Sequence, residues 1–203
     1  MKKWMSLFDL CPIRPSVQKE RAARITAMSY LRDCQDKEQR MEKQLLNTGE
    51  YILLRGKDSY NGLLQRVETN PVSRITGRAI MDLYNSVPKS YRKNAVFLMN
   101  TVTLNELSRN LGVDRNLLSG RDDGTFMLMD QPIVLCNAMP FISKGSVPIL
   151  FGDFGKVSIE DCGRDELQQE PCEGNPGTQQ YTLTGYMDCM LEEQLAVRGI
   201  KIV

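Results

Sequence analysis

The fold is decided by the stretch YRKNAVFLMN, which spans residues 91–100 of the 203-residue chain. Its apolar run, residues 95–99, is unbroken and short, which is typical of a strand buried on both faces. A capping-box pattern follows at 103–106 and predicts a second helix that ends at Gly112. A buried strand that leads directly into a capped helix indicates a layered α/β region here.

A first helix is predicted just before this stretch. Ile80, Leu83, Tyr84 and Val87 recur at the spacing of one helix face, and Pro88 ends the element.

Further towards the N-terminus, the chain reads as one long helix over residues 16–47, a segment without Pro or Gly. Gly49 is expected to stop this helix. Ile25, Met28 and Leu31 would form its apolar stripe, whereas residues 35–40 are polar all round. A helix of about 30 residues spans about 45 Å, so it would project beyond a small core. It would serve as a spine bridging solvent or packing against neighbouring copies.

The remaining segments read mostly as short strands. They are predicted at 51–54, 63–67, 95–99, 126–129, 133–136, 147–151, 157–159, 181–187 and 200–203, with a surface loop at 171–178. The alternation is too irregular for a βαβ series. We therefore predict an α+β fold with a mixed sheet, a compact α/β part and a projecting helix.

Composition limits the function. The chain contains no histidine, which excludes Ser-His and Cys-His nucleophiles and His-ligated zinc. Its formal net charge is +1, but residues 1–120 hold 20 Lys and Arg against 12 Asp and Glu, whereas residues 121–203 hold 6 against 13. This division indicates nucleic-acid contact, complementary surfaces that meet head to tail between copies, or simply solvated faces that differ.

The six cysteines show no paired spacing. They are Cys11, Cys34, Cys136, Cys162, Cys172 and Cys189. We interpret them as reduced thiols in a cytosolic protein, most of them small buried hydrophobes. The first ten residues do not resemble a secretory signal, and no apolar stretch is long enough to span a membrane.

No set of residues makes a convincing active site. Ser86 and Lys89 have an SxxK spacing that Pro88 interrupts, and Asp153 lies in a DFG triplet without the other kinase motifs. The glycine-containing segments 120–124, 152–155 and 174–177 lack phosphate-loop patterns and are read as turns. We therefore predict no enzymatic activity, no catalytic residue, no cofactor and no metal site.

Charged residues elsewhere are read as surface. The acid pairs Asp122-Asp123 and Glu192-Glu193 have no visible partner for acid–base chemistry. The expected long helix has a basic flank, but Tyr30 is its only nearby aromatic residue. Recognition of nucleic acid by base stacking is therefore poorly supported. That flank comprises Arg14, Lys19, Arg21, Arg24 and Arg32.

The order of the segments resembles the major capsid proteins of tailed phages with the Hong Kong ninety-seven-type fold. The resemblance covers residues 17–203 and rests on an ordered set rather than on one motif. The matching pieces are LLRGKD (53–58), NGLL (61–64), YRKNAVFLMN (91–100), DQPIV (130–134), NAMP (137–140) and ILFGDF (149–154).

The resemblance implies a domain organisation. Residues 1–16 would form a short N-terminal segment and 17–74 a peripheral-type domain with the spine helix. Residues 75–185 would form an axial-type domain, and 186–203 would be closing strands that return to the peripheral-type domain. The family's N-terminal arm and extended loop would be absent, because only about 15 residues precede the expected helix.

The function implied is that of a structural subunit of a phage or prophage capsid, which acts by self-association into rings or shells. The alternatives are a capsid-derived protein that interferes with shell assembly and an encapsulin-like bacterial shell protein. Expected partners are copies of itself or full-length capsid subunits, with scaffolding or decoration proteins, non-specific contact with packaged DNA, and no membrane. The expected location is the virion capsid or the host bacterial cytoplasm.

Overall fold

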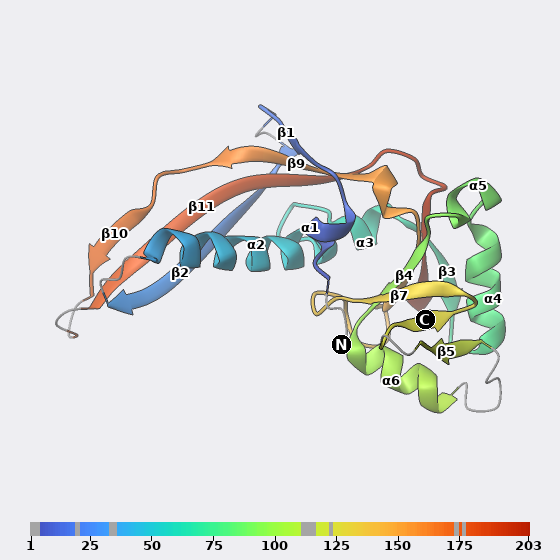
Figure 1. Cartoon of the computed structure of the whole chain (residues 1–203). Coiled ribbons are helices and arrows are strands. Elements are labelled where there is room, and N and C mark those ends of the chain that lie inside the picture. Colours follow the sequence, from blue (N-terminus) through green and yellow to red (C-terminus); the bar gives the residue numbers. More distant parts are fainter. Residues whose placement is uncertain are drawn as a thin grey trace.

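The chain folds into two β-sheets that share one long helix (Figure 1). The structure, a computed structural model, describes residues 5–18, 21–32, 36–110, 117–121, 124–172, 175 and 178–203. The helices are α1 (Leu7–Leu10), α2 (Lys37–Arg55), α3 (Leu63–Arg66), α4 (Gly77–Ser86), α5 (Lys89–Arg92), α6 (Thr101–Asn110) and the 3-10 turn η2 (Phe154–Lys156). The strands are β1 (Ile13–Pro15), β2 (Ala23–Arg32), β3 (Glu68–Val72), β4 (Val96–Met99), β5 (Leu118–Gly120), β6 (Phe126–Leu128), β7 (Gln131–Leu135), β8 (Ile149–Gly152), β9 (Val157–Arg164), β10 (Gln168–Pro171), β11 (Thr178–Leu191) and β12 (Val197–Ile202).

The five-stranded sheet forms the elongated end of the molecule (Figure 1). Its central strand, β11, pairs antiparallel with β2 along one edge and with β9 and then β10 along the other. The short β1 adds parallel to β9 at the border. The helix α2 covers one face, where Leu45 lies so close to Gly185 that a β-carbon there would come within 2.8 Å of the leucine side chain.

The predicted helix over residues 16–47 is wrong in its first half. Residues 23–32 form β2, in which Ala23, Ile25 and Ala27 alternate towards α2 and are almost completely buried. The same apolar residues fit both a helical stripe and the alternation of a strand. Pairing of all ten residues of β2 with β11 favours the strand. A pairing of this kind depends on a segment about 150 residues away, so local propensity did not reveal it.

The helix α2 also continues further than predicted. The expected stop at Gly49 lies inside the helix, where the glycine lets the backbone approach Ile25: an added β-carbon would stand 3.2 Å from its Cδ1 atom. The helix ends at Gly56, whose φ of 77° favours glycine. The predicted strand at 51–54 is therefore the end of α2, and the one at 63–67 is the short helix α3 with its C-cap.

The seven-stranded sheet has the order β3-β12-β8-β4-β7-β6-β5. It is mixed, since β12–β3 and β4–β7 are parallel and the other pairs are antiparallel. On one face, Phe97 and Phe151 stack at 4.3 Å between ring centroids and join the core under α4. On the other face, Leu98 and Leu150 join the core shared with α2. Alternate residues of β4 thus enter two different cores, which explains its unbroken apolar run.

The predictions around this sheet are largely confirmed. The helix expected around 80–87 is α4, and it ends just before Pro88. The capping box at 103–106 is wrong, because α6 begins at Thr101 and Asn100 caps it by accepting a 2.9 Å hydrogen bond from the amide of Val102. The expected stop at Gly112 lies outside the described residues.

The predicted strands of the C-terminal half correspond to β6, β7, β8, β9, β11 and β12, with bounds that differ by a few residues. The exception in length is β11, which runs over fourteen residues. The predicted α+β class is confirmed, since helices cover a mixed sheet and a mostly antiparallel one.

Sheet membership groups residues from distant parts of the chain. The strands β9, β10 and β11 lie in the sheet that α2 covers, although they belong to the second half of the sequence. The strand β12 pairs with β3 and β8 in the other sheet. The chain therefore crosses from the five-stranded to the seven-stranded sheet after α2, returns at β9, and crosses again before β12.

Candidate functional site

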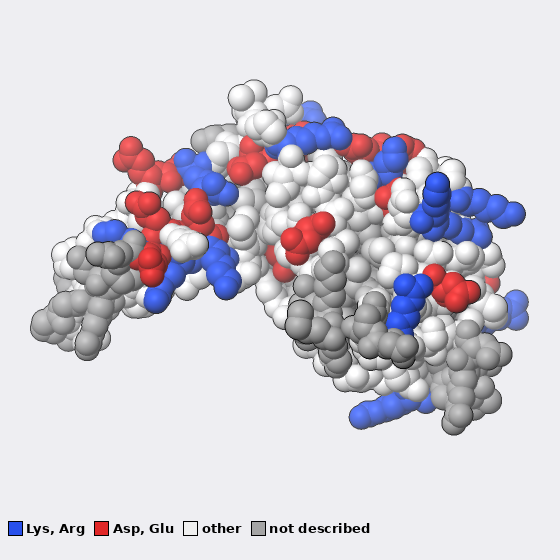
Figure 2. All heavy atoms as spheres, in the orientation of Figure 1, with Lys and Arg blue, Asp and Glu red and all other residues white. Residues whose placement is uncertain are grey.

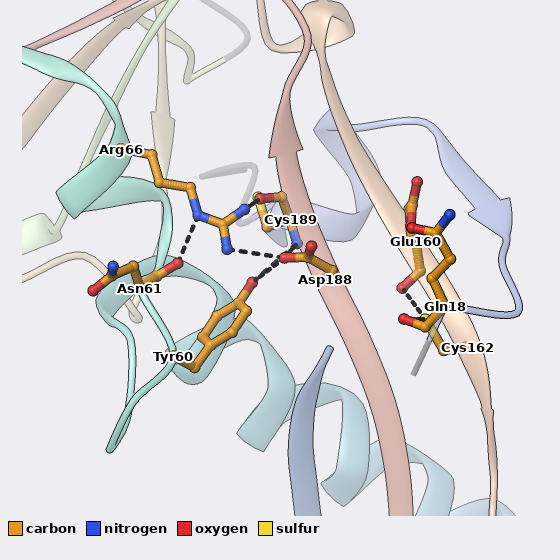
Figure 3. A network of polar contacts seen from close by, with 8 residues as sticks. All are labelled: Gln18, Tyr60, Asn61, Arg66, Glu160, Cys162, Asp188 and Cys189. Atoms are coloured by element: carbon orange, nitrogen blue, oxygen red, sulfur yellow. Dashed lines mark hydrogen bonds and ion pairs between the residues drawn. The ribbon is translucent and has the colours of Figure 1, made fainter. Parts of the chain in front are cut away.

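A network of polar contacts lies where the α2–α3 loop and α3 meet β11 (Figure 3). Asp188 is at its centre, with its side chain only 8% exposed. Its Oδ1 atom accepts hydrogen bonds from Tyr60 Oη at 2.9 Å, from Arg66 Nη2 at 3.0 Å and from the amide of Cys189 at 2.7 Å. The buried carboxylate thus receives three donors at one of its oxygens, which stabilise its charge.

Arg66 connects this carboxylate to the backbone. Its guanidinium donates to the carbonyl of Asn61 at 2.7 Å and to the carbonyl of Cys189, and it lies 5.1 Å from the centre of the Tyr60 ring. Burial, together with the negative charge of Asp188, raises the pKa of Tyr60 above its ordinary value. Tyr60 therefore stays protonated and acts as a fixed donor that holds the loop against β11.

A cavity of about 730 Å³ opens beside the network. Arg21, Arg66, Glu160 and Asp188 bring both signs of charge to its wall. The mixed lining gives no preference for an anion or a cation, so the role that the contacts support is structural. The network fixes the α2–α3 loop and α3 to β11.

A second junction fixes the loop at residues 137–140, one of the segments that carried the family resemblance. Arg55, the last residue of α2, donates to the carbonyl oxygens of Ala138 at 2.6 Å and Met139 at 3.0 Å. The side-chain amide of Asn100 donates to the carbonyls of Asn137 and Met139 at 3.4 Å. Asn100 therefore serves both this loop and the start of α6.

The residues considered for catalysis have local structural roles. The hydroxyl of Ser86 donates to the carbonyl of Leu83 at 2.6 Å, and Asp153 accepts a 3.0 Å hydrogen bond from the amide of Gly155 at the start of η2. Lys89 is an exposed residue at the start of α5. No hydrogen bond or ion pair joins Ser86 to Lys89 within the described part of the chain.

The acid pairs also have defined places. Glu192 pairs with Arg14 at 2.9 Å, and Glu193 pairs with Lys156 at 2.9 Å while accepting a hydrogen bond from the Tyr91 hydroxyl. These two donors lower the pKa of Glu193, the Tyr91 hydrogen bond having the largest effect. Asp122-Asp123 lie outside the described residues.

Burial disfavours the ionised form of the Cys11, Cys136 and Cys189 thiols. Burial raises the pKa of Cys136 to about 12 and that of Cys189 to about 12, and it raises the pKa of Cys11 further. A protonated thiol is a poor nucleophile and a poor metal ligand. In the described ranges, no group of three or more Cys, Asp or Glu side chains could hold a metal ion.

The charge division along the sequence does not become a simple division in space. Figure 2 shows Lys and Arg beside Asp and Glu around α2, and Arg164 there lies 3.7 Å from Glu42 and 3.6 Å from Asp161. The interleaving arises because α2 itself carries both signs of charge, and its Glu42 lies beside Arg164 of β9. The expected basic flank is correspondingly not on a helix, since Arg24 and Arg32 lie on β2 and Lys19 is outside the described residues.

Sequence reasoning missed Tyr60, Arg66, Asp188 and Arg55 as positioning residues. One signal was present: Asp188 directly follows the predicted strand 181–187 and interrupts the apolar run YMDCML (186–191), and an acid in such a place needs a cationic partner. Its partner could not be identified, because Arg66 lies more than 120 residues earlier.

Three further findings bear on the class of protein. No helix among the residues described here is both long and apolar enough to cross a membrane. A family model described as "Phage capsid family" matches residues 39–192, which run from the first turn of α2 to the end of β11. No curated protein matches the chain.

Solved structures of shells share the fold. The capsid of an empty GTA particle matches with a TM-score of 0.70 at 15% identity, covering 100% of this chain and 91% of that one. The capsid of a native GTA particle matches with 0.65 at 17% identity, covering 90% and 73%. The holo-SrpI encapsulin complex from Synechococcus elongatus PCC 7942 matches with 0.62 at 15% identity, covering 89% and 73%.

Proposed function

The chain belongs to the phage capsid family and is a structural, shell-forming subunit, and from that premise we propose that its copies associate head to tail into closed rings within the shell. The observation that carries this proposal is the family match over residues 39–192, which includes α2 and strands of both sheets. A subunit that closes rings with identical copies needs two different complementary surfaces, one for each neighbour.

We assign the two sheets to the two domain types expected from the sequence. The five-stranded sheet with α2 is proposed as the peripheral-type domain, and the seven-stranded sheet with α4 and α6 as the axial-type domain. The pairing of β11 with both β2 and β9 supports placing residues 157–191 in the peripheral type rather than within an axial segment 75–185. The pairing of β12 with β3 and β8 supports placing 197–202 with the axial type.

We further propose that the subunit is not an enzyme. Ser86 and Asp153 are occupied with local backbone contacts, and the buried thiols hold their protons at neutral pH. In the Asp188 network, Tyr60 and Arg66 direct their donors at β11 of the same chain. Contacts of this kind stabilise a fold, as expected of a structural protein that acts through its surface.

The partners proposed are further copies of this chain or full-length capsid subunits, with scaffolding or decoration proteins as additional components. Contact with packaged DNA would be non-specific. The location proposed is the virion capsid, with the host bacterial cytoplasm as the place of assembly.

The test is the assembly state of the purified protein. Size-exclusion chromatography with light scattering, followed by negative-stain microscopy, is expected to show rings or shells above a threshold concentration. Circular dichroism on the same sample verifies that the protein is folded. A folded protein that stays monomeric at all concentrations, and that does not co-assemble with a complete capsid protein encoded beside it, would refute the proposal.

A second candidate is an encapsulin-like shell protein, favoured by the match to the holo-SrpI encapsulin complex. The two candidates differ in what the chain needs to build a closed particle. Closed shells of uniform size, formed by this chain expressed alone, would favour the encapsulin-like function. Rings or open sheets that close only when a second capsid component is supplied would favour the phage-type function.

A further inference from the structure

The strand β2 has a long open edge. It pairs with β11 through ten consecutive residues, Ala23 to Arg32, and none of the described strands pairs with its other side. In an antiparallel pair, alternate residues direct their backbone N–H and C=O groups away from the partner strand. About half of the residues of β2 therefore present backbone hydrogen-bonding groups outwards, which is a template for a further strand.

The opposite border of the same sheet, at the same end of the molecule, is the outer edge of β10. This strand pairs with residues 179–182 of β11, directly across from the part of β11 that pairs with β2. All four of its residues are exposed. Among the described strands, β10 has no neighbour on its outer side.

The two edges are complementary in charge. The strand β2 contains two arginines, Arg24 and Arg32, and no acid. The segment 165–171, with the sequence DELQQEP, contains three acids and no base. Glu166 and Glu170 are exposed and make no ion pair within the part of the chain that the structure describes. Opposite charges at two borders of one sheet favour contact between the border of one copy and the opposite border of the next.

The side chains at the two edges would also meet on one face. Tyr30 pairs with Gln180, and Gln180 pairs with Glu170, so these three residues form a row across the sheet. Tyr30 is 59% exposed and lies on the face of β2 opposite the buried Ala23, Ile25 and Ala27. A second copy added in the same register would place its Glu170 beside Tyr30.

We propose that the outer edge of β2 in one copy pairs with the outer edge of β10 in a second copy, so that the five-stranded sheet continues from subunit to subunit. Both strands run antiparallel to β11, so the new pair is parallel. The contact uses two different edges, which makes it heterologous and suits ring closure. This inference rests on the proposed function and adds to it the surfaces that carry the association.

The first experiment measures backbone protection. Hydrogen–deuterium exchange is followed for β2 in the assembled protein and in the same protein diluted to monomer. Outward-facing amides of β2 are expected to exchange at least about tenfold more slowly in the assembly, because open edge amides gain partners there. If the protein assembles and β2 exchange is unchanged, the inference is overturned while the proposed function stands. If it does not assemble at all, both fail.

The second experiment tests which edges meet. Tyr30→Glu would face the acidic β10 edge, and Glu170→Lys would face the basic β2 edge, so each variant alone is expected to associate roughly two- to fivefold more weakly. An equal mixture of the two variants is expected to recover association, since the Glu of one copy then faces the Lys of the next. Glu38→Lys, an exposed change on α2 at the same end, is the matched control and should leave association unchanged.

Each result of the mixture has one reading. Recovery supports the β2–β10 contact. Failure of the mixture to recover, with both single variants weakened, would mean that each edge meets some other surface, such as β2 of a second copy or another protein, and would overturn the inference. Equal association by both single variants and the control would overturn it as well.

Discussion

Replacing Asp188 by alanine should destabilise the fold more than any other change in the polar network. The substitution leaves Tyr60 Oη, Arg66 Nη2 and the amide of Cys189 without the acceptor that they share. Removing one partner of a buried ion pair typically costs about 3–5 kcal/mol. Arg66 is 27% exposed, so water replaces part of the lost contact, and it keeps the carbonyls of Asn61 and Cys189. We expect a loss of about 2–3 kcal/mol in the free energy of unfolding.

The assay is urea unfolding of the monomer at pH 7, followed by circular dichroism. A fall in the melting temperature of roughly 5–10 °C should accompany the loss for a protein of this size. The matched control is Glu160→Ala, because Glu160 lies opposite Asp188 on β9 but is partly exposed; it should change the free energy by less than about 0.5 kcal/mol. Asp188→Asn, which keeps an acceptor, should fall between the two. A loss below about 1 kcal/mol for Asp188→Ala would refute the reasoning.

Three further predictions concern other parts of the fold. Gly152→Ala should unfold the protein or reduce its soluble yield severely, because Gly152 has a φ of 155° and an added β-carbon would lie 2.1 Å from the carbonyl oxygen of Ala196. Gly120→Ala is the control, since an added β-carbon there would have nothing within 4 Å. Equal soluble yields of the two variants would contradict the prediction. Asn100→Ala should lower the free energy of unfolding by about 1–2 kcal/mol in urea titrations, since α6 loses its cap and the 137–139 loop loses two donors; Asn105→Ala, on the exposed side of α6, should cost much less. Glu193 has a lowered pKa in the folded protein, so its contribution to stability is present above the ordinary pKa of 4.5 and is lost as pH falls through the lower folded pKa. The Tyr91→Phe variant removes one donor and should return the Glu193 pKa towards 4.5, as followed by NMR titration. An unchanged Glu193 pKa in this variant would count against the Tyr91 contact.

The sequence predicted best those elements whose signal is local. The helix α4 has its apolar face at regular spacing and a proline at its end, and β4 has a short unbroken apolar run. Both were placed to within a few residues. Their neighbours in space reinforce the same choice, since β4 is buried between two cores.

Where the sequence misled, the deciding contact was distant. Residues 23–32 have a helical stripe and good helix formers, yet pairing with β11 makes them a strand. Gly49 looked like a helix stop and instead permits the close approach of Ile25. The strand at 51–54 was inferred from an apolar run, of which Ile52, Leu53 and Leu54 are buried at the C-terminal end of α2. Short apolar runs do not distinguish a buried helix turn from a strand.

The functional features of the chain were likewise predictable only where their signal was local. The absence of histidine and the weak catalytic motifs were read from composition and spacing alone. The two edges of the five-stranded sheet could not be predicted, because they exist only once β2 and β10 are placed on opposite sides of β11. Their opposite charges were visible beforehand only as a difference between the two parts of the chain.

The position of β12 between β3 and β8 sets an order of events during synthesis. More than 120 residues separate β3 from β12 along the chain, and β3 has no other strand partner among those described. At about 5–20 residues per second, a ribosome needs roughly 6–25 s to cover that distance. Until then β3 has nothing to pair with, so the seven-stranded sheet is incomplete while the parts of the five-stranded sheet are already made. A nascent chain can therefore complete the seven-stranded sheet only after β12 has been synthesised. This requirement delays the association of the subunit with its neighbours until synthesis is nearly finished.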